Sequence, residues 1–323
     1  MKLAPAERQA RLIEGAKKEG ELDLVPNYRG RQMRDHVGMF EKRHPWMKVR
    51  ISDLNSYQAL ERVLAEETAG KSLTDASKMN LPDYVAIDGK NLIARYPTPA
   101  TQKILPKYRG FLSPDNLWVP QSVSEEAISY NTGLVRKEDA PKSWQDLCHP
   151  RFKGMVAYDV GEPLFLSGLY QILGRDMEKV RQIVECIGKN EPIVIAGNTS
   201  RITLMLAGDH AIQGGNSLYQ GIKSNQDNPR RAIFAVAYDA PVIVFSSVMW
   251  INKNVRRPHA AALYVDWIVS EESQEFLYKE KRGPITMEHP FISPEASLVV
   301  LSPLKLEQTT QLQTYWKQYI GKK

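Results

Sequence analysis

Residues 21–30 read Glu-Leu-Asp-Leu-Val-Pro-Asn-Tyr-Arg-Gly, and this stretch begins the pattern that sets the fold class. Its first five residues alternate apolar with charged side chains, which is typical of a half-buried strand. The proline and the glycine then indicate a loop. An amphipathic helix is predicted next, over residues 31–42, with Met33, Val37 and Phe40 on its apolar face. The stretch therefore predicts a strand, a loop and a helix in succession.

The same alternation continues along the chain on both sides of this stretch. Helices are predicted over residues 5–18 and 56–69, and strands over residues 49–51 and 83–88. Further strands are predicted at 126–130, 155–158, 192–195, 211–214, 233–236 and 242–250, and further helices at 163–173, 177–187, 201–206, 258–268, 270–276 and about 304–319. Strands that alternate with helices are typical of layered α/β domains.

Length and composition limit the classes of protein to consider. The chain has 323 residues, of which 42% are hydrophobic and 25% charged, so about two globular domains are expected. No apolar run approaches the roughly 20 residues of a membrane-spanning helix. The net charge is +6, but the basic residues are spread along the chain without a run of like charges. We therefore expect no nucleic-acid partner.

Motifs of catalysis are missing from the sequence. The six histidines are scattered, and no nucleophile elbow, phosphate-binding loop or dinucleotide fingerprint is present. This favours a binding protein over an enzyme. The two cysteines, Cys148 and Cys186, are interpreted as small buried apolar residues. A disulfide between them requires an oxidising compartment and suitable geometry, and the sequence leaves both alternatives open.

Polar loops follow several predicted strands, and such loops bind ligands at the carboxyl edge of open α/β sheets. The helices that follow them present free N–H groups, which favour an anion, and residues 198–200 are predicted to cap one such helix. Arg29 and Arg201 are predicted to donate forked hydrogen bonds to a carboxylate or phosphate, and tyrosines to supply apolar walls. The candidate ligand-binding residues are Tyr28, Arg29, Asp88, Tyr158, Asp159, Ser200, Arg201, Asn216, Tyr219 and Asp239.

Several segments, taken in order, resemble the bacterial extracellular solute-binding proteins of ABC importers, in the branch that contains the ferric-iron-binding proteins. No single segment is diagnostic, whereas their order from residue 16 to about residue 285 is specific. The matching segments are 16–22 (AKKEGEL), 64–71 (LAEETAGK), 83–88 (DYVAID), 129–132 (SYNT), 143–147 (SWQDL), 152–154 (FKG), 207–212 (AGDHAI), 257–261 (RPHAA) and 270–274 (SEESQ).

This resemblance implies a type II periplasmic binding fold, with two α/β lobes, a ligand cleft between them and a hinge of two crossover strands. The crossovers are expected near residues 119–128 and 235–242. Lobe 1 is then residues 1–118 with about 241–285, and lobe 2 is residues 119–240 with about 286–323. The lobes would close on a bound solute, because a ligand that contacts both favours the closed form.

The resemblance also implies the biological setting. The protein would be a monomer without a cofactor that captures a small, anionic solute in the periplasm and delivers it to an ABC permease in the inner membrane. The chain starts without a signal peptide, which would have been removed or replaced by Met1. A cytoplasmic enzyme and a sensory ligand-binding subunit are the alternatives from other classes.

Ferric iron is the alternative solute. Iron-binding relatives carry two adjacent tyrosines after the strand predicted at 211–214, and here Tyr219 matches one of them while Leu218 replaces the other. Asp88 and Tyr28 fall near the positions of the other two ligands, so a set of Tyr28, Asp88 and Tyr219 would hold Fe³⁺. An arginine common in iron binders is replaced by Glu125 and Glu126, which favours the organic anion.

Overall fold

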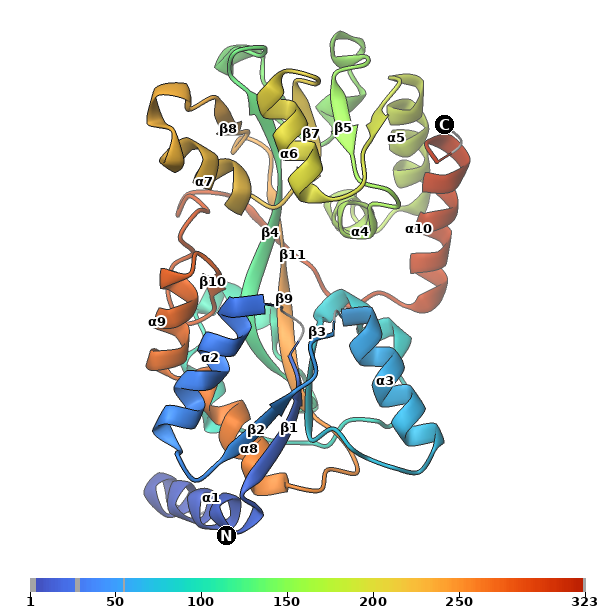
Figure 1. Ribbon diagram of the computed structural model, residues 1–323. Helices are drawn as coiled ribbons and strands as arrows, with labels where there is room; N and C mark the ends of the chain where they lie inside the picture. The colour runs from blue at the N-terminus through green and yellow to red at the C-terminus, as the bar shows by residue number, and fades with distance from the viewer. Residues whose placement is uncertain (1–3, 27–29, 55, 322–323) are drawn as a thin grey trace. The chain divides into compact units, whose positions relative to one another are not determined.

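The computed structural model describes residues 4–26, 30–54 and 56–321, and the chain divides into two compact units (Figure 1). Unit 1 comprises Met1–Val123 and Ser246–Pro290, and unit 2 comprises Ser124–Phe245 and Phe291–Lys323. The chain passes from unit 1 to unit 2 within strand β4 (Val119–Asn131) and returns within strand β9 (Val242–Ile251). Each unit is therefore assembled from segments that are distant in sequence.

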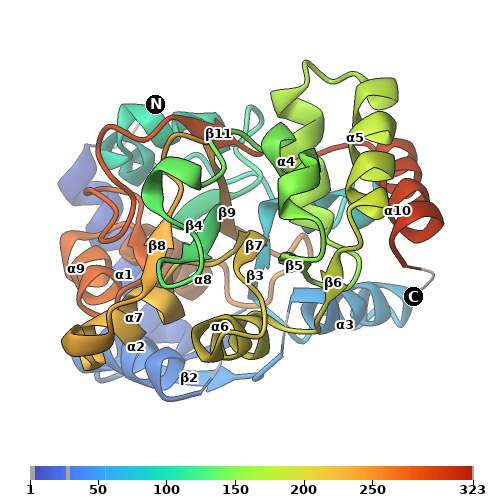
Figure 2. The ribbon, with the colours of Figure 1, turned by 90° about the horizontal axis from the view of Figure 1, so that it is seen from above.

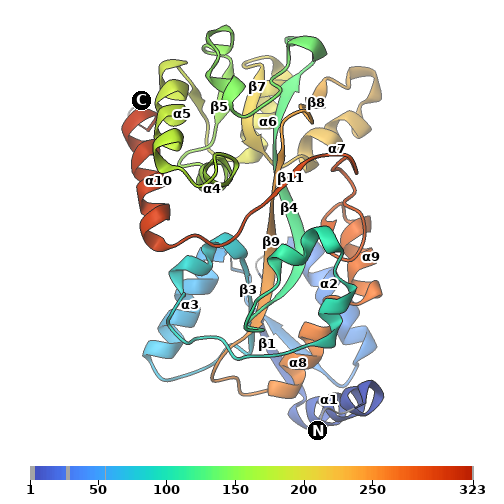
Figure 3. The same ribbon diagram turned by 180° about the vertical axis from the view of Figure 1, so that it is seen from behind.

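Unit 1 is built on a sheet in the order β2-β1-β3-β9. Strands β1 (Glu21–Val25), β2 (Lys48–Ile51) and β3 (Ala76–Asn80) run parallel, and β9 pairs antiparallel with β3. Figures 1 and 3 show helices α2 (Gly30–Arg43) and α3 (Ser56–Thr68) on opposite sides of these strands. The remaining elements are α1 (Pro5–Glu19), α8 (Pro258–Trp267), α9 (Glu271–Lys279) and β10 (Gly283–Pro284).

The predicted helices of unit 1 form where their apolar faces can be buried. Met33, Val37 and Phe40 of α2 are all buried, as the helical spacing predicts. Helix α9 begins at a side-chain cap, because Ser270 Oγ accepts a hydrogen bond from the backbone N–H of Ser273. The residue pattern therefore predicted these two helices correctly.

Unit 2 is built on a sheet in the order β4-β7-β5-β6, with β8 also paired to β4. Strand β5 (Val156–Tyr158) runs parallel to β6 (Ile193–Val194) and to β7 (Ile212–Asn216). Figure 2 shows α10 (Leu306–Tyr319) beside α5 (Met177–Lys189). The other elements are α4 (Pro163–Ile172), α6 (Asn198–Ala207), α7 (Tyr219–Asp227), β8 (Phe234–Val236) and β11 (Leu298–Val300), the last paired with β9.

Short 3₁₀ helices connect these elements. They are η1 (Leu81–Ala86), η2 (Pro99–Lys103), η3 (Pro106–Phe111), η4 (Lys137–Asp139), η5 (Gln145–Cys148), η6 (Pro150–Phe152) and η7 (Pro229–Arg231). Across the ranges that the structure describes, no helix has the length and apolar character needed to span a membrane.

Three local predictions are wrong. The strand predicted at 83–88 is the 3₁₀ helix η1 with a turn after it, and the third strand is β3. The residues of β3 form a strand because β1 and β9 pair with them from both sides, whereas Pro82 has no N–H to donate to a ladder. The crossover predicted near residues 235–242 is also wrong. Residues 237–241 form a turn, and the crossover is the fully buried strand β9.

The third error concerns the start of α6. Gly197 is its N-cap residue, with φ of 85°, and the N-cap residue provides no side-chain cap. Asn198, the first helical residue, instead donates from Nδ2 to Gln220 Oε1 at 3.2 Å. A positive φ is readily adopted only by glycine, so the backbone conformation of Gly197 places the helix start before the predicted cap.

Cys148 and Cys186 form a disulfide that links η5 to α5, with their Cα atoms 5.5 Å apart. This resolves the alternative that the sequence left open. The bond joins two segments of unit 2 that the chain separates by 38 residues.

Candidate functional site

The carboxyl edge of the unit 2 sheet gathers three of the predicted polar loops. Because β5, β6 and β7 are parallel, the loops that leave their carboxyl ends meet at one edge. Helix α4 follows β5, α6 follows β6 and α7 follows β7. Three helix N-termini, with their unpaired backbone N–H groups, therefore begin at this edge.

Arg201, in α6, is the centre of the polar contacts at this edge. Its Nη1 donates to Glu162 Oε1 at 3.1 Å and to the carbonyl oxygen of Gly215 at 2.7 Å. Its Nη2 donates to Asp159 Oδ2 at 3.3 Å. The side chains of Arg201 and Glu162 are each only 3% exposed. The guanidinium thus ties the loop after β5 to the end of β7.

Asp159 connects the loop after β5 to the start of α6. Both of its carboxylate oxygens lie 3.2 Å from the backbone nitrogen of Gly197 and accept its hydrogen bond. A carboxylate near a helix N-terminus is stabilised by the N–H groups and the helix dipole. Asp159 therefore supplies, from another loop, the cap that no side chain of α6 provides.

Glu126 of β4 adds a third carboxyl group to the cluster. Its Oε2 atom is buried and has no hydrogen-bond partner among the described residues. It lies 3.6 Å from the position that a Cβ on Gly215 would occupy. Burial raises the pKa of Glu126 to about 7, against the lowering effect of the Arg201 charge.

Glu162 is affected in the same direction. Burial, followed by the charge of Glu126, raises the pKa of Glu162 well above its usual range, while Arg201 opposes the shift. Because both pKa values move toward neutrality, the cluster carries less negative charge at neutral pH than three ionised acids would give. We call Glu126, Asp159, Glu162 and Arg201 the Arg201 cluster.

Three other predicted residues lie on the same edge or directly beneath it. Asn216 is fully buried at the end of β7, and its Oδ1 accepts from Ser129 Oγ at 2.7 Å. Ser200 is exposed in the first turn of α6, and Tyr219 is half-buried at the first position of α7. The structure thus brings these residues near the loops that the sequence singled out.

Tyr158 has a different environment from the one predicted. It is fully buried, and its ring packs against Phe165 and Trp316 with centroid separations of 5.5 Å and 5.6 Å. Its ring therefore belongs to the core of unit 2 in this structure, rather than to an exposed wall for a solute.

The remaining predicted residues lie elsewhere. Asp88 is exposed in the turn after η1 and accepts a hydrogen bond from Tyr84. It lies beyond the end of the third strand, which is Asn80. Asp239 is exposed in the turn between β8 and β9. Tyr28 and Arg29 fall outside the described residues.

Sequence reasoning missed Glu162 and Glu126. Glu162 adopts a positive φ of 34° just before α4, and it follows Gly161 in a segment interpreted only as a loop. Glu126 lies in a predicted strand, and the alternating pattern of that strand predicted only that its apolar residues are buried. The available signal was the adjacent pair Glu125 and Glu126, an unusual composition for a buried strand.

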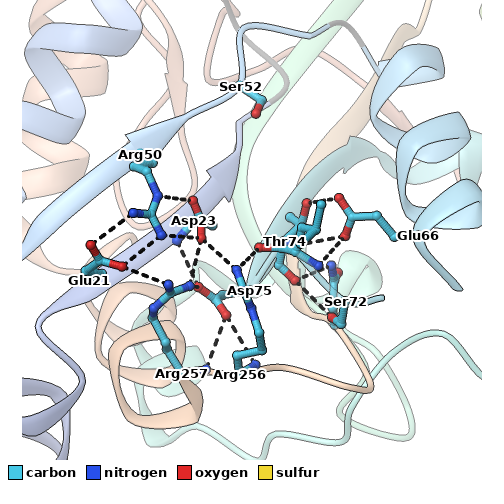
Figure 4. A network of polar contacts seen from close by, with 12 residues as sticks. Glu21, Asp23, Arg50, Ser52, Glu66, Ser72, Thr74, Asp75, Arg256 and Arg257 are labelled. Carbon is cyan, nitrogen blue, oxygen red and sulfur yellow. Dashed lines mark hydrogen bonds and ion pairs between the residues drawn. The ribbon is translucent and has the colours of Figure 1, made fainter. Parts of the chain in front are cut away.

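A second polar network lies in unit 1, at the edge of its sheet where the parallel strands begin (Figure 4). Arg257 donates to Glu21, Asp23 and Asp75, and Arg50 donates to Glu21 and Asp23. Asp23 and Arg50 are directly opposite each other in the β1–β2 register. These charges pair with one another near the amino ends of parallel strands, so the network holds α8 against the sheet rather than presenting a ligand site.

No group of three or more histidine, cysteine, aspartate or glutamate side chains is arranged to hold a metal ion within residues 4–26, 30–54 and 56–321. The Arg201 cluster contains three carboxylates, but the guanidinium occupies the place between two of them.

Comparison with known proteins defines the class of this fold. The model of a family described as bacterial extracellular solute-binding protein matches residues 86–297. The chain therefore belongs to this family of solute-binding proteins, and the predicted family and two-lobed α/β fold class are confirmed. No curated protein matches the sequence significantly.

Solved structures with the same fold are distant in sequence. Iron-bound HitA from Pseudomonas aeruginosa has a TM-score of 0.76 at 15% identity, covering 93% of this chain and 99% of its own. AfuA from Actinobacillus pleuropneumoniae, with fructose-6-phosphate bound, has a TM-score of 0.74 at 17% identity, covering 94% and 100%. Apo FutA2 from Synechocystis has a TM-score of 0.74 at 13% identity, covering 93% and 99%. At these identities the likeness establishes the fold.

Proposed function

We propose that this solute-binding protein captures a small organic anion in the periplasm and delivers it to an ABC permease, and that it catalyses no reaction. The family match and the fold support the transport role. The observation that carries the choice of ligand is the convergence of α4, α6 and α7 at one sheet edge of unit 2. Their first-turn N–H groups and dipoles attract negative charge.

Helix α6 is the most suitable of the three for an external anion. Its first turn includes the exposed residues Thr199 and Ser200. A carboxylate lies at each of the three helix starts. Glu125 Oε1 accepts from the backbone nitrogen of Leu218 before α7 at 3.1 Å, Glu162 precedes α4, and Asp159 accepts from the N-cap nitrogen of α6, Gly197. At α6 that bond is to the N-cap residue, and the exposed first turn follows it. A carboxylate or phosphate group of the solute would bind at the α6 turn. The fructose-6-phosphate bound to AfuA is a solute of this class.

Native mass spectrometry of the purified protein, followed by a thermal-shift screen, tests this function. The screen compares phosphorylated sugars and carboxylates with neutral sugars and amines, because any solute that binds the native state raises the melting temperature. Stabilisation by an anion supports the proposal. Stabilisation by a neutral or cationic solute alone would contradict the choice of anion, and no stabilisation by any class would contradict solute capture.

Ferric iron is the second candidate solute, because HitA is iron-bound in its solved structure. Tyr219, which the resemblance assigned to iron, is half-buried at the start of α7. If the chain binds iron, ferric citrate should produce a visible tyrosinate charge-transfer band, and Tyr219→Phe should abolish it. A colourless wild-type protein would remove iron from consideration.

A further inference from the structure

Glu126 differs from the other two carboxyls of the Arg201 cluster in its hydrogen bonds. Asp159 accepts from the backbone nitrogen of Gly197 at 3.2 Å, and Glu162 Oε1 accepts from Arg201 Nη1 at 3.1 Å. Glu126 is half-buried, but its Oε2 atom is buried and has no hydrogen-bond partner among the described residues. Burying a carboxylate oxygen without a donor is costly, whereas a protonated carboxyl carries no charge to desolvate. The geometry therefore favours the protonated form of Glu126.

The surroundings of Glu126 Oε2 favour the same form. The position that a Cβ on Gly215 would occupy lies 3.6 Å from this oxygen, 3.7 Å from Phe165 Cβ and 3.8 Å from a ring carbon of Trp144. Phe165 and Trp144 belong to the buried core of unit 2. The carboxyl oxygen thus lies at the border between the polar cluster and an apolar core, where the charged form is disfavoured.

Charged groups on the neighbouring elements also act on Glu126. Burial raises the pKa of Glu126 to about 7, the charge of Arg201 opposes this rise, and the charges of Asp159 and Glu125 add to it. Glu162 faces the same group, because the charge of Glu126 contributes to the raised pKa of Glu162. Glu126 therefore changes its charge near neutral pH.

Two further titratable side chains near the cluster stay neutral in this range. Tyr158 of β5 is fully buried, and burial followed by the charge of Glu162 raises the pKa of Tyr158 well above its usual range. His210 is buried just before β7, and burial lowers the pKa of His210 to about 4, with the charge of Asp209 opposing and that of Arg201 adding to this shift. Near pH 7 the change in charge of the cluster therefore comes from its carboxyls.

The cluster is joined directly to the first turn of α6, where the proposed anion binds. Arg201 is the fourth residue of α6, and Asp159 accepts its hydrogen bond from Gly197, the N-cap residue of that helix. Glu126 interacts electrostatically with both Arg201 and Asp159. Charges that are partly buried are screened less than exposed ones. A negative charge on Glu126 therefore acts on an anion at this turn without contact between Glu126 and the solute.

We propose that the charge of Glu126 controls capture of the anion: the protonated carboxyl permits an anion to bind at the first turn of α6, and the ionised carboxyl repels it. This inference rests on the proposed function and adds a response to pH at the same site. Because a bound anion disfavours ionised Glu126 in turn, binding should take up a proton above about pH 7. Affinity should be constant well below that pH and should fall above it.

The test uses sulfate and oxalate as probes, because the charges of both are constant between about pH 5.5 and about pH 9. Isothermal titration calorimetry on the full chain measures affinity at constant ionic strength, and repetition in buffers of different ionisation enthalpy measures proton uptake. The variant is Glu126→Gln, because glutamine has the shape of a protonated glutamic acid and cannot ionise. Glu295→Gln, at an exposed position of unit 2, is the matched control.

We expect the affinity of the wild type for the better-bound probe to fall about threefold or more across this pH range, with proton uptake in its upper part. Glu126→Gln should bind as the wild type does at the low end of the range. It should keep that affinity at the high end and take up no proton. Glu295→Gln should follow the wild type at every pH.

Three results would overturn the inference. The first is a wild-type affinity that is the same at both ends of the range. The second is a fall in affinity that persists in Glu126→Gln, since another group then titrates. The third is a lower affinity of Glu126→Gln at every pH, which indicates a structural role.

The probes also separate this inference from the proposed function. If neither sulfate nor oxalate binds at any pH while the thermal-shift screen finds an organic anion, the control by Glu126 fails and the proposed function stands. If the screen finds no solute either, both fail.

Discussion

Arg201 and Glu162 form a buried ion pair, with Arg201 Nη1 3.1 Å from Glu162 Oε1 and both side chains 3% exposed. The pair joins the helix after β6 to the loop after β5, and Gly215 supplies a further acceptor for the same guanidinium nitrogen. A buried pair of this kind depends strongly on both partners, because a remaining single charge has no hydration.

Replacing Arg201 with methionine should destabilise the protein by up to about 3–5 kcal/mol, because Glu162 must then take up a proton or stay buried as a charge without its partner. The measurement is the free energy of unfolding from urea titration. Arg136→Met is the control, since Arg136 is 73% exposed and its ion pairs should be worth less than about 1 kcal/mol. Equal, small effects of both variants would show that the buried pair contributes little.

Replacing Glu126 with glutamine should change how stability depends on pH. The pKa of Glu126 is raised to about 7 in the folded state, from 4.5, so the folded protein holds a proton that the unfolded chain releases. The associated stability is complete below pH 4.5 and is lost as the pH rises through about 7. Relative to the wild type, Glu126→Gln should therefore gain about 3 kcal/mol of stability between low and high pH.

Unfolding titrations at pH values on either side of this range check the result. Glu295→Gln, in an exposed position of unit 2, is the matched control and should show the same pH profile as the wild type. An identical profile for Glu126→Gln would mean that the carboxyl of Glu126 titrates normally.

Removing the disulfide should lower stability by about 4 kcal/mol in the chain-entropy model, because the bond closes a sequence separation of 38 residues. The double variant Cys148→Ser/Cys186→Ser and the reduced wild type should both show this loss in urea unfolding. The double variant should not respond to added dithiothreitol. If the wild type also fails to respond, the cysteines are not joined in the protein.

Replacement of each of two glycines with alanine should change the stability of the protein in opposite directions. A Cβ on Gly214 of β7 would lie 2.1 Å from the ring of Tyr158, whereas nothing lies within 4 Å of a Cβ on Gly38 in α2. Gly214→Ala should cost about 1–3 kcal/mol through overpacking. Gly38→Ala should stabilise the helix by about 0.5–1 kcal/mol. Thermal unfolding measures both, and a stable Gly214→Ala protein would mean that the Tyr158 ring shifts easily.

The periodicity of the sequence predicted most helices of both units, because helix faces are set by local spacing. Residues 31–42 and 177–187 are examples, and their helices α2 and α5 extend only a few residues further. The strand at 83–88 was predicted wrongly because the prediction used local spacing alone. Its apolar run is typical of a strand, but the segment has no strand partners among the described residues. Strand pairing depends on distant residues, as for β3, which pairs with β9.

The candidate site shows the same division. Asp159, Ser200, Arg201, Asn216 and Tyr219 could be selected from the sequence, because strand-to-helix loops have local turn and cap signals. The sequence could not predict which groups lie around Arg201. Glu126 and Glu162 come from separate segments, and they approach Arg201 only after β4, β5 and α6 have packed. Local residue patterns specify secondary structure and loop chemistry. Contacts between segments distant in the chain set burial, charge pairing and pKa, and so the chemistry of the Arg201 cluster.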